Sequence, residues 1–518
     1  MLCAAAALAM ESAFDGVWEV PVPGRPTGIV IEIKTDGSRL TGSFSGPNGR
    51  LELRKGSVTG EEAKFDIEFA FQGRLITTRF TGRIENGELI LTGEMPGIEQ
   101  KMTAKRRAAD AGAPDWFSRP DAPAEITEWL KSNGMPLGDD LASFRERIKG
   151  SRIVAMGEAT HGTSEFQVLK RRTFQMLVEQ LGYTVFAIES PWANSVAIDD
   201  YINGRVDDLR TALHGHYNWW QTEEFAELLR WMRAYNLDPA HRRKLKFAGF
   251  DIRGAGQLTR RVLAYLDRVD PSLRAHVSGF LGGIEEFEVP SYENAGAEAH
   301  SRMKAEIDAL IRAFDERRDN YIRKTSESEW AEARQSAVVL QQSEARARLG
   351  TGAGSASRDR SMAENVQWII DREPPGTKVM LWAHNGHVAD QSLPYQSMGS
   401  YLRRIYGDAL AICGFVFGEG SFRAIPSDGG GARTFTVGPP PRGSLDATFG
   451  GTGLPLFGVD LRTATGRAAE WLTGPQISRQ IGGEYSEKTA PIYTHDITPR
   501  ASYDILIYVA KTTGTRPL

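Results

Sequence analysis

Two patterns of hydrophobic and polar positions divide the chain. In its first part, hydrophobic and polar residues alternate in short runs, for example at residues 28–34 and 63–69. A period of two residues is typical of strands with one buried face, and Asn86-Gly87 is a typical hairpin turn because glycine accepts the positive φ that such turns need. We find no convincing helical pattern between the runs. Residues 14–107 are therefore predicted to form a separate antiparallel all-β domain, a small barrel or a sandwich.

Beyond about residue 125, short continuous apolar runs alternate with helical patterns. Residues 153–156 are all apolar, which is typical of a parallel strand buried on both faces. A helical pattern follows over residues 163–181 and ends at Gly182. Further apolar runs lie at residues 185–188, 245–250, 378–383, 409–417, 457–461 and 503–509. Strands that alternate with helices predict an α/β domain with a mainly parallel sheet over residues 125–518.

Helical patterns also fill residues 256–371. Within them, residues 304–349 carry many Glu/Arg pairs at helical spacing. Such a surface is either simply solvated or belongs to a helical lid over the sheet edge. Residues 350–357 are rich in glycine and serine, so they are predicted to form a flexible hinge that leads into Arg358.

Composition marks the ends of the two predicted domains. Residues 2–10 are almost all small or apolar, so we interpret residues 1–13 as a signal-peptide remnant and the protein as exported, either periplasmic or extracellular. Residues 108–124 are rich in proline, alanine and aspartate and are predicted to be a linker. Cys3 would leave with the signal, so no disulfide is expected within one chain, and a cysteine-rich metal site is excluded.

Polar side chains follow three of the apolar runs. Glu158 and His161 come directly after the first run, Glu189 ends the second, and His384 and His387 follow the run at residues 378–383. Ligands bind at the carboxyl ends of strands in an open α/β sheet, so we expect these groups to meet at one edge. A single histidine in such a place is more often structural. Three histidines with two carboxylates are typical of an active site.

The segments around these positions resemble the motifs of the erythromycin esterase family, in the family's order. They are Gly157-Glu-Ala-Thr-His-Gly-Thr-Ser-Glu-Phe166 with Lys170 and Arg172 after it, Phe186-Ala-Ile-Glu189, Trp219-Trp-Gln-Thr-Glu-Glu224, Arg230-Trp-Met-Arg-Ala-Tyr-Asn236, Arg358-Asp-Arg-Ser-Met-Ala-Glu-Asn365 and Trp382-Ala-His-Asn-Gly-His387. The resemblance implies the family's fold and a hydrolase of carboxylic esters, with His161 as general base. A macrolide lactone or a related cyclic ester is the substrate that the family name suggests.

The first domain carries no catalytic cluster. Gly16-Val-Trp18 is similar to the start of a lipocalin-like barrel, although a tryptophan there more readily belongs to the core. The domain is interpreted either as a binding or spacer module or as a domain that adds stability.

Several catalytic motifs are absent from the catalytic region, and this limits the reactions that it can catalyse. We find no Gly-x-Ser-x-Gly elbow, no Walker loop or dinucleotide fingerprint in a strand–turn–helix context, and no His-Glu-x-x-His. The mechanism that remains is hydrolysis by an activated water molecule. A neutral histidine takes a proton from water, and a carboxylate on its other nitrogen fixes the tautomer. His161 is the predicted base, with Glu189 or Glu158 to orient it or hold the water. His384 and His387 can donate to the oxyanion, and one of them can protonate the leaving alkoxide.

Arg358 has two interpretations. It is either a further donor to the oxyanion or a partner that neutralises buried carboxylates such as Asp359, Glu158 or Glu189. Candidates for substrate contact are Arg172, Trp219, Trp220, Asp251 and Asp359. The two tryptophans could line a cleft for a bulky apolar ligand or belong to the core, and Asp251 could equally cap the next helix.

Two alternatives to metal-free hydrolysis stay open. Glu158-x-x-His161 and His384-x-x-His387 supply nitrogen and oxygen ligands suited to zinc or manganese, and a relative that has lost catalysis would only bind a ligand. We expect no cofactor. The net charge of −4 gives no reason to expect nucleic acid or an anionic membrane as partner. A small-molecule ester is the expected partner, and the oligomeric state is open.

Overall fold

A computed structural model describes residues 12–21, 28–46, 49–71, 74–95, 98–108, 119–138, 140–350, 352–391, 395–487, 490 and 493–518. Most of the predicted signal-peptide remnant and most of the predicted linker lie outside these residues.

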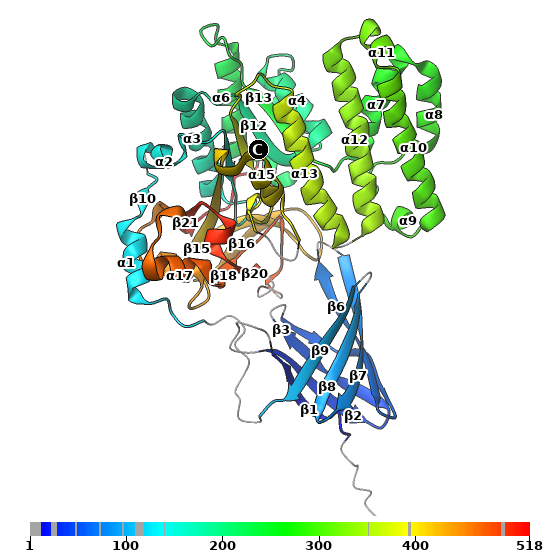
Figure 1. The fold of residues 1–518 in the computed structure, drawn as a ribbon, viewed down its shortest axis with the longest axis vertical. Coiled ribbons are helices and arrows are strands. Elements are labelled where there is room, and N and C mark those ends of the chain that lie inside the picture. Colours follow the sequence, from blue (N-terminus) through cyan, green and yellow to red (C-terminus); the bar gives the residue numbers. More distant parts are fainter. Residues whose placement is uncertain are drawn as a thin grey trace, which may run out of the picture.

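The first nine strands form an antiparallel sheet that closes on itself. They are β1 (Gly16–Val20), β2 (Ile29–Asp36), β3 (Arg39–Gly46), β4 (Gly49–Glu52), β5 (Arg54–Thr59), β6 (Glu62–Phe71), β7 (Arg74–Glu85), β8 (Glu88–Met95) and β9 (Ile98–Arg106). They pair in the order β2-β1-β9-β8-β7-β6-β5-β3-β4, and the additional pairing of β2 with β3 closes the ring. The result is a barrel, one of the two predicted forms (blue in Figure 1). Asn86 and Gly87 turn the β7–β8 hairpin with φ of 51° and 81°.

Large side chains pack inside the barrel. Trp18 is fully buried and donates from Nε1 to the carbonyl of Phe14 at 2.8 Å. Trp18 is therefore a core residue. Phe80 also packs inside the barrel: a Cβ atom at Gly93 would lie 2.6 Å from its ring, so the glycine makes room for it.

The second sheet is mainly parallel, as the sequence predicts. Its strands are β10 (Met135–Pro136), β11 (Ile153–Met156), β12 (Val185–Pro191), β13 (Lys246–Asp251), β14 (Val379–Trp382), β15 (Leu410–Pro426), β16 (Arg433–Val437), β17 (Leu456–Asp460), β19 (Glu484–Tyr485) and β21 (Ile505–Thr512). The main order is β10-β17-β21-β15-β11-β14-β12-β13, with β16 and β19 paired to β15. From β21 to β13 all neighbours are parallel, while β10, β16 and β17 pair antiparallel.

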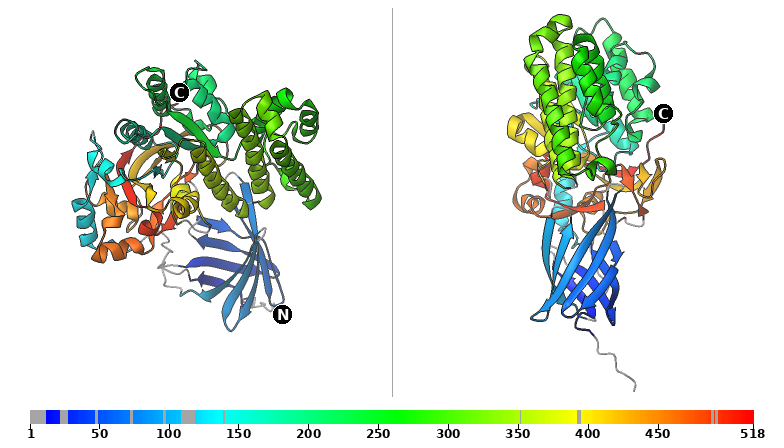
Figure 2. Two further views of the ribbon diagram at one scale, coloured as in Figure 1. Left: turned by 45° about the horizontal axis from the view of Figure 1, so that its top comes forward. Right: turned by 90° about the vertical axis from the view of Figure 1, so that its right-hand side faces the viewer.

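Helices cover both faces of this sheet (Figure 2). One face packs against α2 (Ala142–Ile148), α3 (Ser164–Leu181), α4 (Trp192–Ile202) and α6 (Glu223–Leu237). The other packs against α1 (Ala124–Ser132), α13 (Ala353–Asp371), α15 (Met398–Tyr406), α16 (Leu445–Gly450) and α17 (Gly466–Thr473). Because both faces are covered, the central strands are apolar throughout.

The predicted helical region forms a bundle beside the sheet (green in Figure 1). It contains α7 (Ala255–Val269), α8 (Pro271–Leu281), α10 (Ala297–Glu316), α11 (Arg318–Lys324) and α12 (Glu327–Leu349), which share a core of their own. None of the helices in the described ranges is both long and apolar enough to cross a bilayer.

The predicted hinge at residues 350–357 is wrong for most of its length. Helix α12 ends at Leu349 and α13 begins at Ala353, so most of these residues are helical. A Cβ atom at Gly354 would lie 2.5 Å from the carbonyl oxygen of Arg346. The small residues therefore allow the two helices to approach closely, and their composition reflects packing instead of mobility.

Candidate active site

Adjacent parallel strands bring most of the candidate residues to one edge of the sheet. β11, β14, β12 and β13 are neighbours, so their carboxyl ends lie side by side. Glu158 and His161 follow β11, Glu189 lies in β12, Asp251 ends β13, and His384 and His387 follow β14. A Cβ atom at Gly157 would collide with the side chain of Asn385, so glycine lets the loops after β11 and β14 touch.

Buried charges hold the imidazole of His161. Its Nδ1 lies 2.6 Å from Oε1 of Glu158, whose Oε2 accepts from Lys170 Nζ at 2.6 Å and from Trp382 Nε1 at 2.7 Å. Glu158 and Lys170 are fully buried, and His161 is 7% exposed. The carboxylate fixes the proton on Nδ1 and leaves the lone pair on Nε2, where no described residue forms a hydrogen bond. The imidazole is therefore arranged to accept a proton.

Lys170 makes this arrangement dependent on pH. Burial lowers the pKa of its ammonium to about 8, although the charge of Glu158 opposes the effect. Below this pH the charged ammonium restrains Glu158. As the pH rises through about 8, Lys170 loses its proton and the restraint weakens, so we expect kcat to fall.

Substitutions at Lys170 test this prediction. Lys170→Met should lower kcat by about 10- to 100-fold, because a charge-assisted hydrogen bond contributes about 1.5–3 kcal/mol. Lys170→Arg keeps its charge at all accessible pH, so the alkaline decline should disappear. Steady-state rates across neutral and alkaline pH measure both effects, and a decline with the same midpoint in either variant would contradict this role of Lys170.

A second network centres on the guanidinium of Arg358. It donates from Nε and Nη2 to the two oxygens of Asp251 at 2.8 and 2.9 Å, and from Nη2 to Oε1 of Glu189 at 2.8 Å. Burial acts to raise the pKa of both carboxyl groups. The charge of Arg358 outweighs it at Asp251, and the charges of His387 and Arg358 outweigh it at Glu189, so both pKa values lie well below the usual range. Arg358 is thus paired with buried carboxylates. The sequence suggested Asp359 as one possible partner, whereas in the structure Asp251 takes that place.

His387 lies between two carboxylates. Nδ1 is 2.9 Å from Oδ1 of Asp359, and Nε2 is 3.3 Å from Oε1 of Glu189. Burial favours the neutral ring, but these carboxylates raise the pKa of His387 to about 10. Nη1 of Arg358 also lies 3.0 Å from Nε2, a contact that needs the unprotonated ring because a guanidinium only donates. We assign the imidazolium, since two carboxylates favour it.

His384 presents an N–H group without a partner. Its Nδ1 accepts from the backbone N of Gly386 at 3.2 Å, so the ring proton is on Nε2. Burial and the neighbouring His161 and His387 hold the pKa of His384 well below its usual range, and the ring is neutral. Nε2 is buried, and nothing in the described ranges accepts its proton. The ring lies edge-on to His161 with centroids 5.5 Å apart, so this donor is close to the base.

The two candidate tryptophans differ in their surroundings. Trp220 is fully buried, donates from Nε1 to the carbonyl of Glu189 at 3.2 Å and packs edge-on against Trp382. Trp219 is partly exposed and lies nearly parallel to the ring of His161, with centroids 5.0 Å apart. Trp220 is a core residue, whereas Trp219 presents a ring surface beside the base.

The remaining candidates for substrate contact are engaged elsewhere. Arg172 donates to the carbonyls of Leu137 and Gly138, outside both networks. Asp251 and Asp359 are buried and already accept hydrogen bonds from Arg358 and His387, which suits them to position those groups.

Sequence reasoning did not assign roles to Lys170 and Tyr217. Lys170 stands on the buried side of α3, together with Phe166 and Phe174, and a lysine on an apolar stripe is the signal that could have identified it. Tyr217 donates from its hydroxyl to Oδ2 of Asp251 at 2.7 Å. Nothing in its sequence context indicates that partner.

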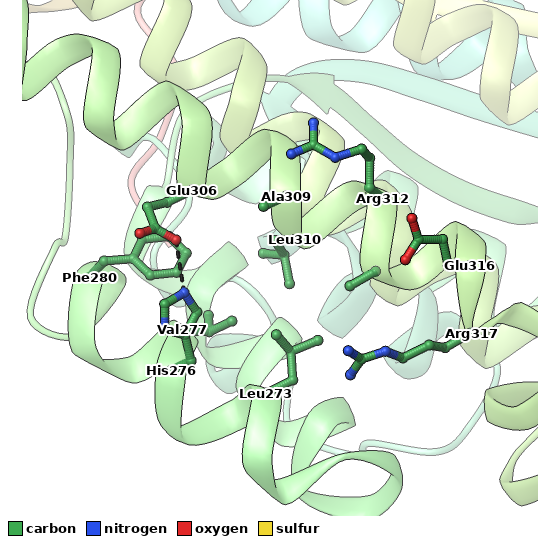
Figure 3. A pocket seen from close by; sticks show the side chains of 11 residues that line it. Leu273, His276, Val277, Phe280, Glu306, Ala309, Leu310, Arg312, Glu316 and Arg317 are labelled. Carbon is green, nitrogen blue, oxygen red and sulfur yellow. Dashed lines mark hydrogen bonds and ion pairs between the residues drawn. The ribbon is translucent and has the colours of Figure 1, made fainter.

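A pocket of about 300 Å³ lies away from these residues, in the helical bundle (Figure 3). It lies between α8 and α10, where Nε2 of His276 is 2.8 Å from Oε2 of Glu306. None of the candidate catalytic residues lines it.

Within the part of the chain that the structure describes, no three His, Cys, Asp or Glu side chains are grouped to hold a metal ion. Glu158 already accepts from three donors, and Nδ1 of His384 accepts from a backbone N–H. The cluster therefore fits a metal ion poorly.

Known proteins resemble this chain over most of its length. The YbfO protein of Bacillus subtilis (strain 168), which is named as a hydrolase, is 26% identical over 394 residues, covering 68% of this chain and 85% of its own. Erythromycin esterase type II of Escherichia coli is 24% identical over 371 residues, covering 63% of this chain and 86% of its own. A crystal structure of a Bacillus cereus protein has the same fold, with a TM-score of 0.69 and 23% identity over 77% of this chain and 100% of that chain. The family model for erythromycin esterase matches residues 178–512, more than half of the sequence, and this hydrolase therefore belongs to the erythromycin esterase family.

Proposed function

We propose that this hydrolase cleaves a carboxylic ester with a water molecule that His161 activates, and that its substrate is a cyclic ester such as a macrolide lactone or a related compound. The observation that carries the proposal is the buried Glu158–His161 pair at 2.6 Å, which leaves Nε2 of His161 as the proton acceptor. The name of the Escherichia coli relative, an erythromycin esterase, supports the substrate class.

In the proposed reaction, Nε2 of His161 takes a proton from water while the water oxygen bonds to the ester carbonyl carbon. Glu158 stabilises the imidazolium that results. The carbonyl oxygen becomes an oxyanion, for which Nε2–H of His384 is a nearby donor. When the tetrahedral intermediate collapses, the bond to the alcohol oxygen breaks. That oxygen takes the proton from His161, which restores the base. A cyclic ester is thereby opened to a single hydroxy acid, and a linear ester gives an acid and an alcohol.

A substrate panel tests this proposal. Steady-state hydrolysis is measured for macrolide lactones, linear esters and the matching amides. We expect the esters to be cleaved, the lactones fastest, and the amides to react far more slowly because an amine is a poorer leaving group. Cleavage of linear esters alone would contradict the cyclic substrate, and cleavage of no ester would contradict the proposal as a whole.

We predict that ester hydrolysis survives exhaustive chelation. The oxygens of Glu158 and Nδ1 of His384 are already engaged, so they are poor ligands for zinc or manganese. Activity should be unchanged after dialysis against EDTA. If activity is lost and one equimolar divalent metal restores it, the Glu/His cluster is a metal site.

We propose that the barrel, residues 14–107, is a separate domain from the catalytic residues 125–518. The backbone N of Arg119 donates to the carbonyl of Arg442 at 3.1 Å, and Arg442 donates back to Asp121 at 2.7 Å, so the end of the linker belongs with the catalytic domain. A chain that begins at Arg119 should fold and keep its kcat on a small soluble ester. Circular dichroism and steady-state rates check this. An insoluble or inactive truncation would show that the two parts share a core or a site.

A further inference from the structure

We infer that Trp219 is a positioning residue for the general base: its indole, held flat against His161, stabilises the imidazolium that forms when His161 takes a proton from water. This inference rests on the proposed role of His161 and goes beyond contact with substrate. Three features carry it: the stacking geometry, the contacts that restrain the indole, and a glycine that makes room for it.

The two rings stack nearly parallel. Their planes differ by 11° and their centroids are 5.0 Å apart, within the distance of about 6 Å at which an aromatic face stabilises a cation, an effect that is strongest for tryptophan. The other aromatic neighbours of His161, Trp220 and His384, approach it edge-on, at 65° and 64°. A neutral imidazole gains little from the indole face. The contact therefore strengthens as proton transfer proceeds, which is the condition for an interaction to accelerate a reaction.

Further contacts restrain Trp219. The ring of Tyr217 stacks on it with centroids 4.7 Å apart, and the tyrosine is anchored through its hydroxyl to Asp251. Nε2 of the buried Gln167 donates to the carbonyl of Trp219 at 3.0 Å and to the carbonyl of His161 at 3.3 Å. One amide group thus ties the backbone of the base to the backbone of the stacked tryptophan.

A glycine makes room for the indole. A Cβ atom at Gly483 would lie 2.5 Å from Cζ3 and 2.7 Å from Cη2 of Trp219, whereas a Cβ atom at Gly482 would meet nothing within 4 Å. Gly483→Ala therefore displaces the indole without a change in His161, and Gly482→Ala is its matched control.

The test combines these two variants with Trp219→Phe and Trp219→Leu. For Trp219→Leu we expect kcat/KM to fall by about 2- to 30-fold and the acid limb of its pH profile to move to lower pH by about 0.4 to 1.5 pH units. Trp219→Phe should show a smaller change because its face binds cations less strongly. Gly483→Ala should shift in the same direction, and Gly482→Ala should match the unsubstituted protein. Should Trp219→Leu fail to fold, Trp219→Phe and Gly483→Ala carry the test.

Titration of the His161 ring by NMR of ¹⁵N-labelled histidine measures the same effect without substrate, with the signal assigned by its loss in His161→Asn. We expect its midpoint to move to lower pH in Trp219→Leu. A higher KM with an unchanged acid limb and an unchanged NMR titration would overturn the inference and make Trp219 a substrate contact alone. If the NMR titration moves and the acid limb of the rate does not, the stacking inference stands, and the proposed role of His161 as base fails.

Discussion

Replacing His161 with asparagine should lower kcat by about 10²- to 10⁴-fold, the usual contribution of a general base. The amide of asparagine can still donate to Glu158, which lies 2.6 Å from the native ring, but it offers water no basic lone pair. The midpoint of thermal unfolding should therefore change little. Steady-state kinetics and thermal denaturation of the same preparation measure both quantities.

An exposed histidine–glutamate pair serves as control. His276 and Glu306 are joined at 2.8 Å in the helical bundle, outside the candidate active site. His276→Asn should leave kcat and the unfolding midpoint close to those of the unsubstituted protein. Activity of His161→Asn within a few-fold of the unsubstituted protein would remove His161 from the mechanism.

Replacing Arg358 with alanine should lower the free energy of unfolding by about 3–5 kcal/mol, because it takes the guanidinium away from the buried carboxylates of Asp251 and Glu189. Arg358→Lys keeps the charge but loses the planar fork, so an intermediate loss is expected. Since Arg358 donates three hydrogen bonds to these carboxylates, we expect kcat per folded molecule to change far less than stability. Urea unfolding and rates corrected for the folded fraction test this.

Arg403 provides the control for Arg358. It is 21% exposed and donates to Asp390 at 3.1 Å and to Asp504 at 2.6 Å, outside the candidate active site. Arg403→Ala should lose stability with kcat unchanged. A fall in kcat of about 10²- to 10³-fold for Arg358→Ala, with KM and the unfolding midpoint nearly unchanged, would instead make Arg358 a donor to the oxyanion.

The central strands could be predicted from the sequence because they are buried on both faces. A continuous apolar run marks such a strand directly, and the run at residues 153–156 coincides with β11. Closure of the barrel could not be predicted, since it depends on the pairing of β1 with β9, two strands far apart in the sequence whose pairing a two-residue period does not specify. The hinge prediction was wrong because small residues are equally typical of a flexible loop and of closely packed helices such as α12 and α13.

The position of the candidate active site could also be predicted, because topology alone places the residues after adjacent parallel strands at one edge. Their partners depend on side-chain directions that spacing does not show. The sequence left Glu158 and Glu189 as equal candidates to orient His161, and the structure places Glu158 on its Nδ1. The contact of Trp219 with Gly483 joins segments far apart in the chain, which no local pattern reveals.

The pH dependence of kcat/KM, measured for the unsubstituted protein and for His161→Asn, tests most directly whether His161 activates the water. The unsubstituted protein should gain activity with rising pH along an acid limb, as the base loses its proton. In His161→Asn the residual rate should no longer depend on pH over that range. An acid limb with the same midpoint in the variant would show that another group takes the proton, and it would contradict the proposed mechanism.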